Sequence, residues 1–467
     1  IVVLKCRTAM KMSQERERIT MEKMTKNSYL FKMSVPIFIE LLLQLLVGNI
    51  DQIMVSRYSQ ASVAAIVNGN QIMNIIIITI NMLCMATTVV LTQCLGAEDR
   101  YKSNQLCLIS MMVISGISLL ASAITLFFSD SIFRMMNIDP EILHETCMYL
   151  MIVGGFSIVQ GLYLNFAAIL RSHTRLKEVM VVSIIMNVLN IIGNAILING
   201  LFGFPRLGVV GAAVSTVISK TIGLLLIYIA YKKYTGIELK LRYLKEGSKE
   251  TLFKLLKIGI PSGAENFSYN LSQICILGII NPYGAAVTAT KGYCSLLANF
   301  AYVYAIAISE AVQIVIGYLL GSGKIQEVEK KVWWTLKVSV AVCVGMMFII
   351  WFFSNSVLGI FTDNPEMLAL GRQVLFIDIF LEFGRAINIL MTKSLISVGE
   401  IKVPICVGIS FHWAVALFLS YIFGGVFHLG LQGIWVAMMI DECFRGFIYL
   451  LRFHGKKWKR RYEPAAI

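Results

Sequence analysis

The segment Ser34–Tyr58 reads SVPIFIELLLQLLVGNIDQIMVSRY and decides the fold class of this chain. It is an apolar run long enough to cross a lipid bilayer, since a spanning helix needs about 20 such residues. It also contains two carboxylates, Glu40 and Asp51. Ionisable side chains are costly in lipid and usually face a bundle interior or a watery cavity. Asp51 is therefore either a helix-end acid that pairs with Arg57 near the head groups, or part of a cation site that drives transport.

Composition extends this membrane assignment to the whole chain. Of the 467 residues, 57% are hydrophobic and only 15% are charged, against about 25% charged in a typical soluble domain. The net charge of +14 does not indicate nucleic-acid binding, because the basic residues fall in loops between apolar runs. The ten Cys and five His are scattered without CxxC or HExxH spacing, which argues against a metal site or a disulfide scaffold. We therefore predict an all-α polytopic membrane protein without a cofactor, and a monomer.

Twelve apolar segments are predicted to be transmembrane helices. They cover residues 33–56, 64–92, 104–128, 144–170, 178–200, 208–231, 252–280, 286–319, 330–353, 367–396, 402–424 and 430–452. The predicted divisions are an N-terminal tail (1–32), a six-helix lobe (33–231), a linker (232–251), a second six-helix lobe (252–453) and a C-terminal tail (454–467). The linker region contains LKLRYLKEGSKETLFKLLK, which predicts either an amphipathic helix lying on the membrane surface or a plain connection.

Basic residues give the orientation. Of the 41 Lys and Arg residues, 33 lie in the two tails and in the loops on the same side of the membrane, whereas the opposite loops carry four. Cytoplasmic loops carry the excess of Lys and Arg. Both termini are therefore predicted to be cytoplasmic, in a multi-pass protein of the plasma (inner) membrane.

The two halves of the chain repeat at one constant offset, without a gap. The matched positions include an acid and several prolines and glycines, some of them at turns: Pro36 with Pro261, Glu40 with Glu265, Gly96 with Gly321, Pro140 with Pro365, and Gly208 with Gly433. Each half holds six helices, an even number, so both halves begin on the same face. We therefore predict two lobes related by a pseudo-two-fold axis along the membrane normal.

Polar side chains inside the spans are candidates for a site. In the first half, Asn187, Asn190 and Asn194 share one helix face. Such amides either join helices by hydrogen bonds or, together with an acid, bind a proton or a small hard cation. In the second half, Asp378, Glu382 and Arg385 share a face. The remaining candidates there are Glu265, Asn388, Asp441, Glu442 and Arg445. For this second set, structural ion pairing of Glu382 with Arg385 and of Asp441 with Arg445, and a functional role, both remain open.

Arg385 is predicted to be held by Glu382 and by an acid of a neighbouring helix, Glu265 or Asp441, because a lone guanidinium in lipid is costly. The predicted spans contain eight acidic and four basic side chains in all. An acidic interior favours cationic substrates.

The order and spacing of several motifs resemble the multidrug and toxic compound extrusion family over nearly the whole chain, from Ser34 to about Arg452. These motifs are VGNIDQIMVSRYS, LNIIGNAIL and LGVVGAAVSTVIS in the first half, and GIPSGAEN, LEFGRAIN and LQGIWVAMMIDECFR in the second. The chain looks similar to the bacterial DinF-like branch of that family. The resemblance implies two six-helix lobes and export of organic cations driven by inward flow of H+ or Na+.

The resemblance also implies site residues. The family's first-lobe cation site maps onto Asp51, Asn165, Asn190, Asn194 and Thr216, where Na+ is an alternative to a proton. The second-lobe acids map onto Glu265 and onto Glu382 or Asp378, beside Arg385. One departure leaves the ion open, because the position of Asn194 is often Asp in the branch with a proton-binding acid in the first helix.

Two other functions remain as alternatives. A lipid-linked oligosaccharide flippase of the same superfamily would need a basic cavity for pyrophosphate, whereas this interior is acid-rich. A membrane-embedded enzyme acting on lipid would need a His/Asp/Ser or metal constellation, and the five His show no such grouping. The sequence therefore favours a secondary antiporter that is not an enzyme.

Overall fold

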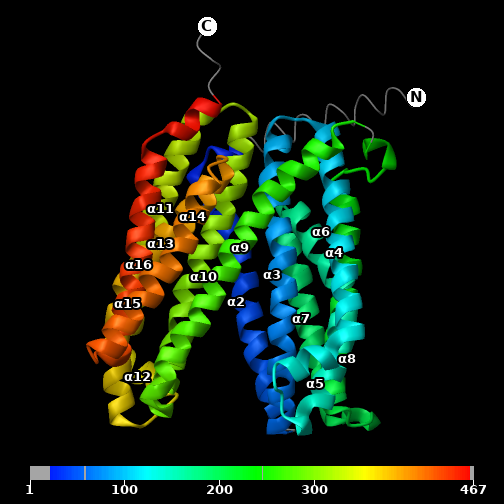
Figure 1. The fold of residues 1–467 in the computed structure, drawn as a ribbon. Coiled ribbons are helices and arrows are strands. Elements are labelled where there is room, and N and C mark those ends of the chain that lie inside the picture. The colour runs from blue at the N-terminus through cyan, green and yellow to red at the C-terminus, as the bar shows by residue number, and fades with distance from the viewer. Residues whose placement is uncertain (1–21, 57–58, 245, 463–467) are drawn as a thin grey trace. The chain divides into compact units, whose positions relative to one another are not determined.

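The structure is a computed structural model of residues 1–467, and it describes residues 22–56, 59–244 and 246–462, without the side chains of residues 49, 51, 52, 60, 199 and 202. The secondary structure of the described chain is entirely helical (Figure 1). The first half holds α2 (Asn27–Ser56), α3 (Gln60–Gly96), α4 (Arg100–Met135), α5 (Pro140–Gly155), α6 (Ser157–Ser172), α7 (Leu176–Asn199) and α8 (Gly208–Tyr234). The second half holds α9 (Ser248–Ile280), α10 (Ala285–Gly321), α11 (Ile325–Phe352), α12 (Ser354–Leu358), α13 (Pro365–Ser397), α14 (Lys402–Phe411), α15 (Phe418–Ser420) and α16 (Gly430–His454).

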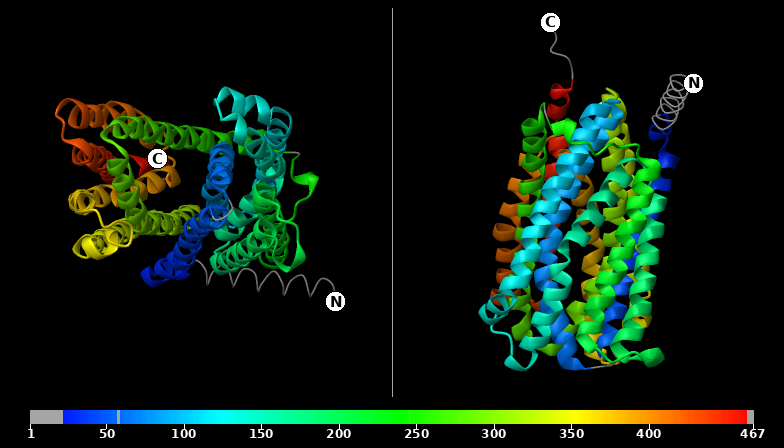
Figure 2. Two further views of the ribbon diagram at one scale, coloured as in Figure 1. Left: turned by 90° about the horizontal axis from the view of Figure 1, so that it is seen from below. Right: turned by 90° about the vertical axis from the view of Figure 1, so that its right-hand side faces the viewer.

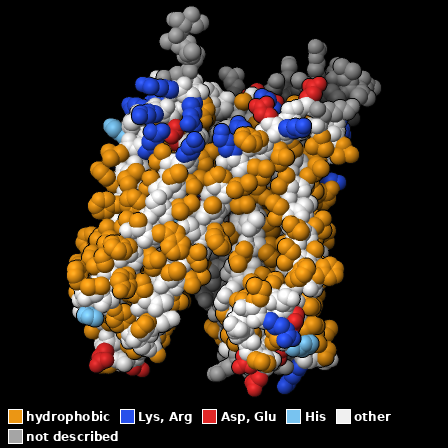
Figure 3. Space-filling view, viewed as in Figure 1, with side chains coloured by type: hydrophobic (Ala, Val, Ile, Leu, Met, Phe, Trp, Pro, Cys, Tyr) orange, Lys and Arg blue, Asp and Glu red, His pale blue; other side chains and the backbone are white. Residues whose placement is uncertain are grey.

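The helices account for the twelve predicted spans, six in each half. Among the described residues, eight helices are long and apolar enough to cross a membrane, and the bent pair α5–α6 makes a ninth span. The helices α9, α13 and α16 complete the twelve. They fall short of that apolarity test because they carry polar and charged side chains within the bundle. On the face shown in Figure 3, hydrophobic side chains cover the length of the C-terminal helices and Lys and Arg gather where α16 ends.

The repeat is confirmed by the helix positions. The helices α3 and α10 both have 37 residues, and the same offset that relates Pro36 to Pro261 relates their first and their last residues. Pro140 and Pro365 each occupy the first turn of a helix, α5 and α13. The preceding residue caps the helix in both cases, because Asp139 accepts from Glu141 N at 2.9 Å and Asn364 accepts from Glu366 N at 2.9 Å. A proline inside a helix recurs at Pro36 and Pro261.

Two spans differ between the halves, and the sequence analysis did not predict either difference. The helix pair α5–α6 bends by 44° around Phe156, where Ser157 Oγ donates to the carbonyl of Gly154 at 2.6 Å, whereas α13 runs unbroken for 33 residues. The span that corresponds to α7 contains two π-helical turns, η4 (His412–Leu417) and η5 (Tyr421–Val426). Single π turns inside α-helices are frequent at functional sites.

The chain divides into two compact units. The N-terminal unit comprises residues 39–91 and 99–263, and the C-terminal unit comprises the described residues up to Phe38, residues 92–98 and the described residues from 264 onward. The unit boundaries after Phe38 and Gly263 are equivalent positions of the repeat, so they fall at matching points inside α2 and α9. The predicted lobes, 33–231 and 252–453, divide the chain at the linker instead, which lies within the N-terminal unit.

Each unit has its own helix packing (Figure 2). In the N-terminal unit, α8 packs against α5, α6 and α7, and α4 packs against α5 and α6. Phe133, Tyr149, Leu150 and Ile198 belong to one buried apolar cluster there. In the C-terminal unit, α13 contacts α10, α11 and α16. This central position of α13 explains why its polar face is buried.

Of the two alternatives for the linker, its described residues form the plain connection and no separate surface-lying helix. Residues Leu241–Leu244 form one 3-10 turn, η2, and the basic and apolar residues from Ser248 onward form the first turns of α9. The linker between the repeats is therefore shorter than predicted, because α8 continues to Tyr234 and α9 begins at Ser248.

Two repeat-equivalent glycines allow a close helix contact within the C-terminal unit. A Cβ on Gly96 would lie 2.3 Å from the carbonyl oxygen of Tyr318, and a Cβ on Gly321 would lie 2.1 Å from that of Gln93. Small residues let helix backbones approach in this way in membranes.

We expect Gly321→Val to lower the stability of the protein by at least about 1–3 kcal/mol, the usual cost of overpacking. The midpoint of thermal unfolding in detergent measures this effect. The matched control is Gly345→Val in α11, where a Cβ would meet no atom within 4 Å. Equal midpoints for the two variants would show that the contact at Gly321 does not matter.

Candidate functional site

The amide face of α7 packs against α8 in the N-terminal unit. Asn190 Nδ2 donates to Thr216 Oγ1 at 3.3 Å, and Ser215 Oγ donates to the backbone carbonyl of Asn190 at 3.0 Å. Gly193 makes this approach possible, because a Cβ there would lie 2.4 Å from Ser215 Oγ. Two of the predicted first-lobe residues, Asn190 and Thr216, are therefore in direct contact, and both are also used to join two helices.

Asn165 lies on the neighbouring helix α6 and is fully buried. Its Oδ1 accepts from Ser110 Oγ of α4 at 3.4 Å, and within the described part of the chain its Nδ2 has no hydrogen-bond partner. A buried NH2 group needs an acceptor, so Asn165 suits a carboxylate better than a bare cation. Asn194 is buried on α7. The side chain of Asp51 lies outside the described residues, so its place relative to these amides is still a prediction.

Glu40 forms an ion pair in the N-terminal unit. Arg171 Nη2 of α6 lies 2.6 Å from Glu40 Oε1, and the Glu40 side chain is buried. The first-half acid that repeats Glu265 is therefore already held by a guanidinium at the end of α6. This pairing argues for a structural role of Glu40, because removal of one partner would leave a buried charge.

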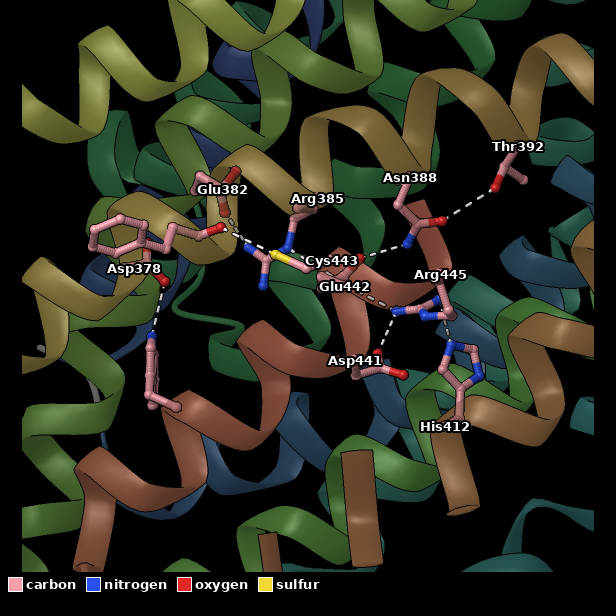
Figure 4. Close-up of polar contacts among 12 residues, drawn as sticks. Asp378, Glu382, Arg385, Asn388, Thr392, His412, Asp441, Glu442, Cys443 and Arg445 are labelled. Carbon is pink, nitrogen blue, oxygen red and sulfur yellow. Dashed lines mark hydrogen bonds and ion pairs between the residues drawn. The ribbon is translucent and has the colours of Figure 1, made fainter. Parts of the chain in front are cut away.

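Arg445 of α16 is the centre of a charged cluster in the C-terminal unit (Figure 4). Its Nη2 lies 2.6 Å from Asp441 Oδ2 and 3.1 Å from Glu442 Oε1, and its Nη1 lies 3.0 Å from His412 Nε2. Arg445 is 3% exposed. The pairing of Asp441 with Arg445 agrees with the i, i+4 spacing in the sequence.

Arg385 of α13 joins this cluster by a different route from the predicted one. It pairs with Glu382, as predicted, but the acid from the neighbouring helix is Glu442, whose Oε1 lies 3.7 Å from Arg385 Nε. The predicted partners Glu265 and Asp441 are wrong. Glu442 is one residue beyond Asp441, so a rotation of about 100° along α16 separates the two side chains. Glu442 thereby lies between the two arginines.

Two more polar side chains of α13 point to the same helix, α16. Asp378 Oδ1 accepts from Trp435 Nε1 at 2.8 Å, and Asn388 donates through Nδ2 to Glu442 Oε2. The Tyr302 ring lies under the Arg385 guanidinium, 5.6 Å from it. In the described chain, one oxygen each of Asp378, Glu382 and Asp441 is buried without a hydrogen-bond partner. The cluster therefore retains acceptor capacity.

His412 was missed by the sequence analysis, which compared the histidines only with one another. Its Nε2 lies 3.0 Å from Arg445 Nη1, a group that can only donate, so a hydrogen bond between the two requires Nε2 to accept. The same Nε2 lies 3.9 Å from Glu265 Oε1. The ring sits on the first residue of the π turn η4 and meets the Tyr269 ring at 5.4 Å.

Glu265 differs from the other acids of the cluster. Its side chain is 20% exposed, whereas the other four acids are buried. Among the described residues, neither Glu265 nor Asp378 has a Lys or Arg within ion-pair distance. The chain packs Glu265 against Gly408 of α14, where a Cβ would lie 3.0 Å from Glu265 Cγ. Glu265 is thus the most exposed acid of this cluster.

The repeat itself would have pointed to His412. Its constant offset pairs Asn187 with His412, Thr216 with Asp441 and Lys220 with Arg445. The scaffold positions that carry neutral amide and hydroxyl groups in the first half therefore carry an imidazole and a carboxylate in the second. The two halves share helices but not the chemistry of their polar faces.

The comparison with protein families settles the membership of the chain. The model of the MatE family matches residues 36–196 and 261–422, and the two matches begin at the repeat-related prolines Pro36 and Pro261. The chain belongs to the MatE family. This finding confirms the resemblance and the repeat, and MatE members are membrane transporters; the assignment to the DinF-like branch remains a prediction.

The alignments with known relatives extend over nearly the full length of this MatE protein. The "Uncharacterized transporter YisQ" of Bacillus subtilis is 36% identical over 93% of this chain and 95% of its own length. The "Probable multidrug resistance protein NorM" of Thermotoga maritima is 27% identical, with 92% and 93% covered. A structure described as MATE in the bent conformation superposes with a TM-score of 0.86 at 20% identity, over 95% of this chain and 98% of that one. The structural likeness confirms the fold, in which twelve helices form two six-helix lobes.

Proposed function

We propose that this MatE transporter is a secondary antiporter that exports organic cations in exchange for H+ or Na+ by alternating access. The observation that carries the proposal is the charge of the C-terminal cluster. Five carboxyl groups (Glu265, Asp378, Glu382, Asp441 and Glu442) lie around the two guanidinium groups of Arg385 and Arg445. The excess of carboxyl groups favours a cationic guest and disfavours the pyrophosphate of a lipid-linked oligosaccharide.

Transport needs no covalent step in this proposal. A ligand shifts an equilibrium between outward- and inward-facing states only by its differential affinity for the two states. The coupling ion at the Asp51 site and the substrate at Glu265 would bias that equilibrium in opposite senses. The name given to the Thermotoga maritima relative, a probable multidrug resistance protein, supports the cargo class.

Transport by the purified protein in liposomes tests the proposal. A proton gradient and a sodium gradient are imposed separately, and uptake of a fluorescent organic cation is followed. Uptake that depends on one of the two gradients is expected. Uptake that needs neither gradient would contradict antiport, and uptake of an anionic lipid-linked sugar in place of the cation would favour a flippase.

Glu265→Gln should weaken binding of a monovalent organic cation by about tenfold or more, because a hydrogen bond to a charged group contributes about 1.5–3 kcal/mol. Binding of a neutral analogue of the same shape is the control. Isothermal titration of both ligands in detergent measures the effect. Equal losses for the two ligands would show that Glu265 only packs against Gly408.

The proposed orientation, with both termini in the cytoplasm of the plasma membrane, is testable by thiol labelling. Gln326 lies in the first turn of α11, and Asp363 lies beyond the other end of that helix, between α12 and α13; both residues are exposed. In a protein whose native cysteines are replaced, Asp363→Cys should react with an impermeant thiol reagent on intact cells. Gln326→Cys should react only after permeabilisation, and its labelling in intact cells would reverse the orientation.

A further inference from the structure

A cavity of about 460 Å³ lies in the N-terminal unit, between the first turn of α4 and the segment that joins α8 to α9. Its walls combine two arginines, two tyrosines and the backbone at a glycine; the lining residues are Arg100, Tyr101, Asn104, Gly236, Glu238, Arg242 and Tyr243. The proposed transport mechanism uses none of these residues.

Two buried amide side chains of α4 hold the outer wall in place. Gln105 donates through Nε2 to the carbonyl of Tyr243 at 2.9 Å and to that of Glu246, and its Oε1 accepts from Thr251 Oγ1 at 2.8 Å. Asn104 Oδ1 accepts from the backbone N–H of Glu238 at 3.1 Å. The joining segment is therefore fixed onto α4, and the cavity is a built feature of the unit.

The cavity is positively charged on balance. Arg242 is oriented by Glu238 Oε2 at 3.0 Å and by the hydroxyl of Tyr243 at 2.9 Å. Lys240 also lies 2.8 Å from Glu238, and this hydrogen bond lowers the pKa of the Glu238 carboxyl. Glu238 is thus shared between two positive charges, those of Lys240 and Arg242. Residues 98–102 and 232–257 together carry ten basic and five acidic side chains.

The depth of the cavity matches the head-group region of a bilayer. It lies at the start of α4 and past the end of α8, and both helices are long and apolar enough to span. Tyr101 at the cavity is 44% exposed and Leu241 beside it is 74% exposed. Tyrosines are enriched at membrane–water interfaces, and basic pockets on the cytoplasmic side of transmembrane helices bind anionic head groups.

We propose that this cavity binds the head-group phosphate of an anionic glycerophospholipid. The planar guanidinium groups of Arg100 and Arg242 match phosphate oxygens in two-pronged geometry. The exposed Leu241 and Tyr101 lie beside the acyl chains, and this apolar rim favours a lipid over a soluble phosphate. The site is independent of the proposed transport function.

Lipid-dependent thermal unfolding of the purified full chain in neutral detergent tests the site. Titration with phosphatidylglycerol should raise the unfolding midpoint in a saturable way, whereas phosphatidylcholine should not. The double variant Arg100→Gln/Arg242→Gln should bind phosphatidylglycerol about 30-fold more weakly, since each basic residue near an anionic surface contributes about 1 kcal/mol. The variant Gln105→Leu should also lose the effect, although all charges remain, because it releases the cavity wall.

Three results would overturn the proposal. The charge-matched control Lys249→Gln/Lys254→Gln changes two exposed lysines of the same region that do not line the cavity. A loss of the lipid effect in this control equal to that of the arginine pair would mean that surface charge alone attracts the lipid. Inorganic phosphate that reproduces the shift would indicate a soluble anion, and an unchanged shift in Arg100→Gln/Arg242→Gln would place the lipid elsewhere.

Discussion

Arg445→Ala is expected to destabilise the protein by about 3–5 kcal/mol, the cost of breaking a buried ion pair by removal of one partner. The change leaves Asp441 and Glu442 without their closest guanidinium and leaves Nε2 of His412 without a donor. The yield of folded protein and the midpoint of thermal unfolding in detergent measure the loss.

Two further variants separate charge from packing at Arg445. Arg452→Ala removes a partly exposed guanidinium from Glu400 near the end of the same helix, and Arg461 still pairs with Glu400 at 3.0 Å. The variant Arg452→Ala should therefore lower the stability of the protein much less than Arg445→Ala does. The triple variant Arg445→Met/Asp441→Asn/Glu442→Gln removes all three charges and should recover much of the stability, because apolar or neutral replacements of buried ion networks are often tolerated. No recovery would mean that the guanidinium shape, rather than charge balance, holds α16.

Asp51→Asn should abolish coupling of transport to the ion gradient while the protein still folds and inserts. Coupling free energies of 1–3 kcal/mol correspond to about 5–150-fold effects, so gradient-driven accumulation of the cation should fall by a factor in that range. Transport in liposomes with and without the gradient measures it. Facilitated exchange without a gradient should persist.

The swap Asp51→Asn/Asn194→Asp is the matched test of the predicted first-lobe site. It moves the single carboxylate from α2 to the buried position on α7 and keeps the total charge. Partial recovery of coupling would support a shared site for these two residues. No recovery, with Asp51→Asn already inactive, would leave Asp51 as the carboxylate that acts and Asn194 as a helix-joining amide. Full activity of Asp51→Asn alone would remove Asp51 from the mechanism.

The helices were predictable because the lengths of the apolar runs, the turn residues and the repeat all indicated the same helix boundaries. The observed spans begin and end within several residues of the predicted ones, and Asp139 and Asn364 cap α5 and α13 at the predicted turns. The bend at Phe156 was not predicted, although Gly154 and Gly155 come directly before it, because the apolar run continues across it. No pattern in the sequence indicated the π turns that begin at His412 and Tyr421.

Apart from His412, the residues of the C-terminal cluster were predictable from the sequence, but their pairing between helices was not. Same-helix spacing correctly gave Glu382 with Arg385 and Asp441 with Arg445. Partners on different helices depend on helix rotation, which periodicity does not fix to one residue. Asp441 was therefore predicted as a partner of Arg385, whereas the observed partner on α16 is Glu442. The location of His412 beside Glu265 follows from the packing of α14 on α9 at Gly408, which no local pattern reveals.

The way Gln105 fastens the segment between α8 and α9 also bears on protein engineering. A connection between two halves of a transporter is the usual place to insert a fluorescent domain or to divide a gene into two fragments. Tolerance of insertion depends on burial and hydrogen bonding of the affected backbone rather than on position in the sequence. An insertion after Tyr243 would pull apart the carbonyls that Gln105 holds. The turn at Gly236, whose residue is exposed and adopts a positive φ of 63°, is the better point of entry for keeping the fold, although an insertion there would alter the proposed lipid site that Gly236 lines.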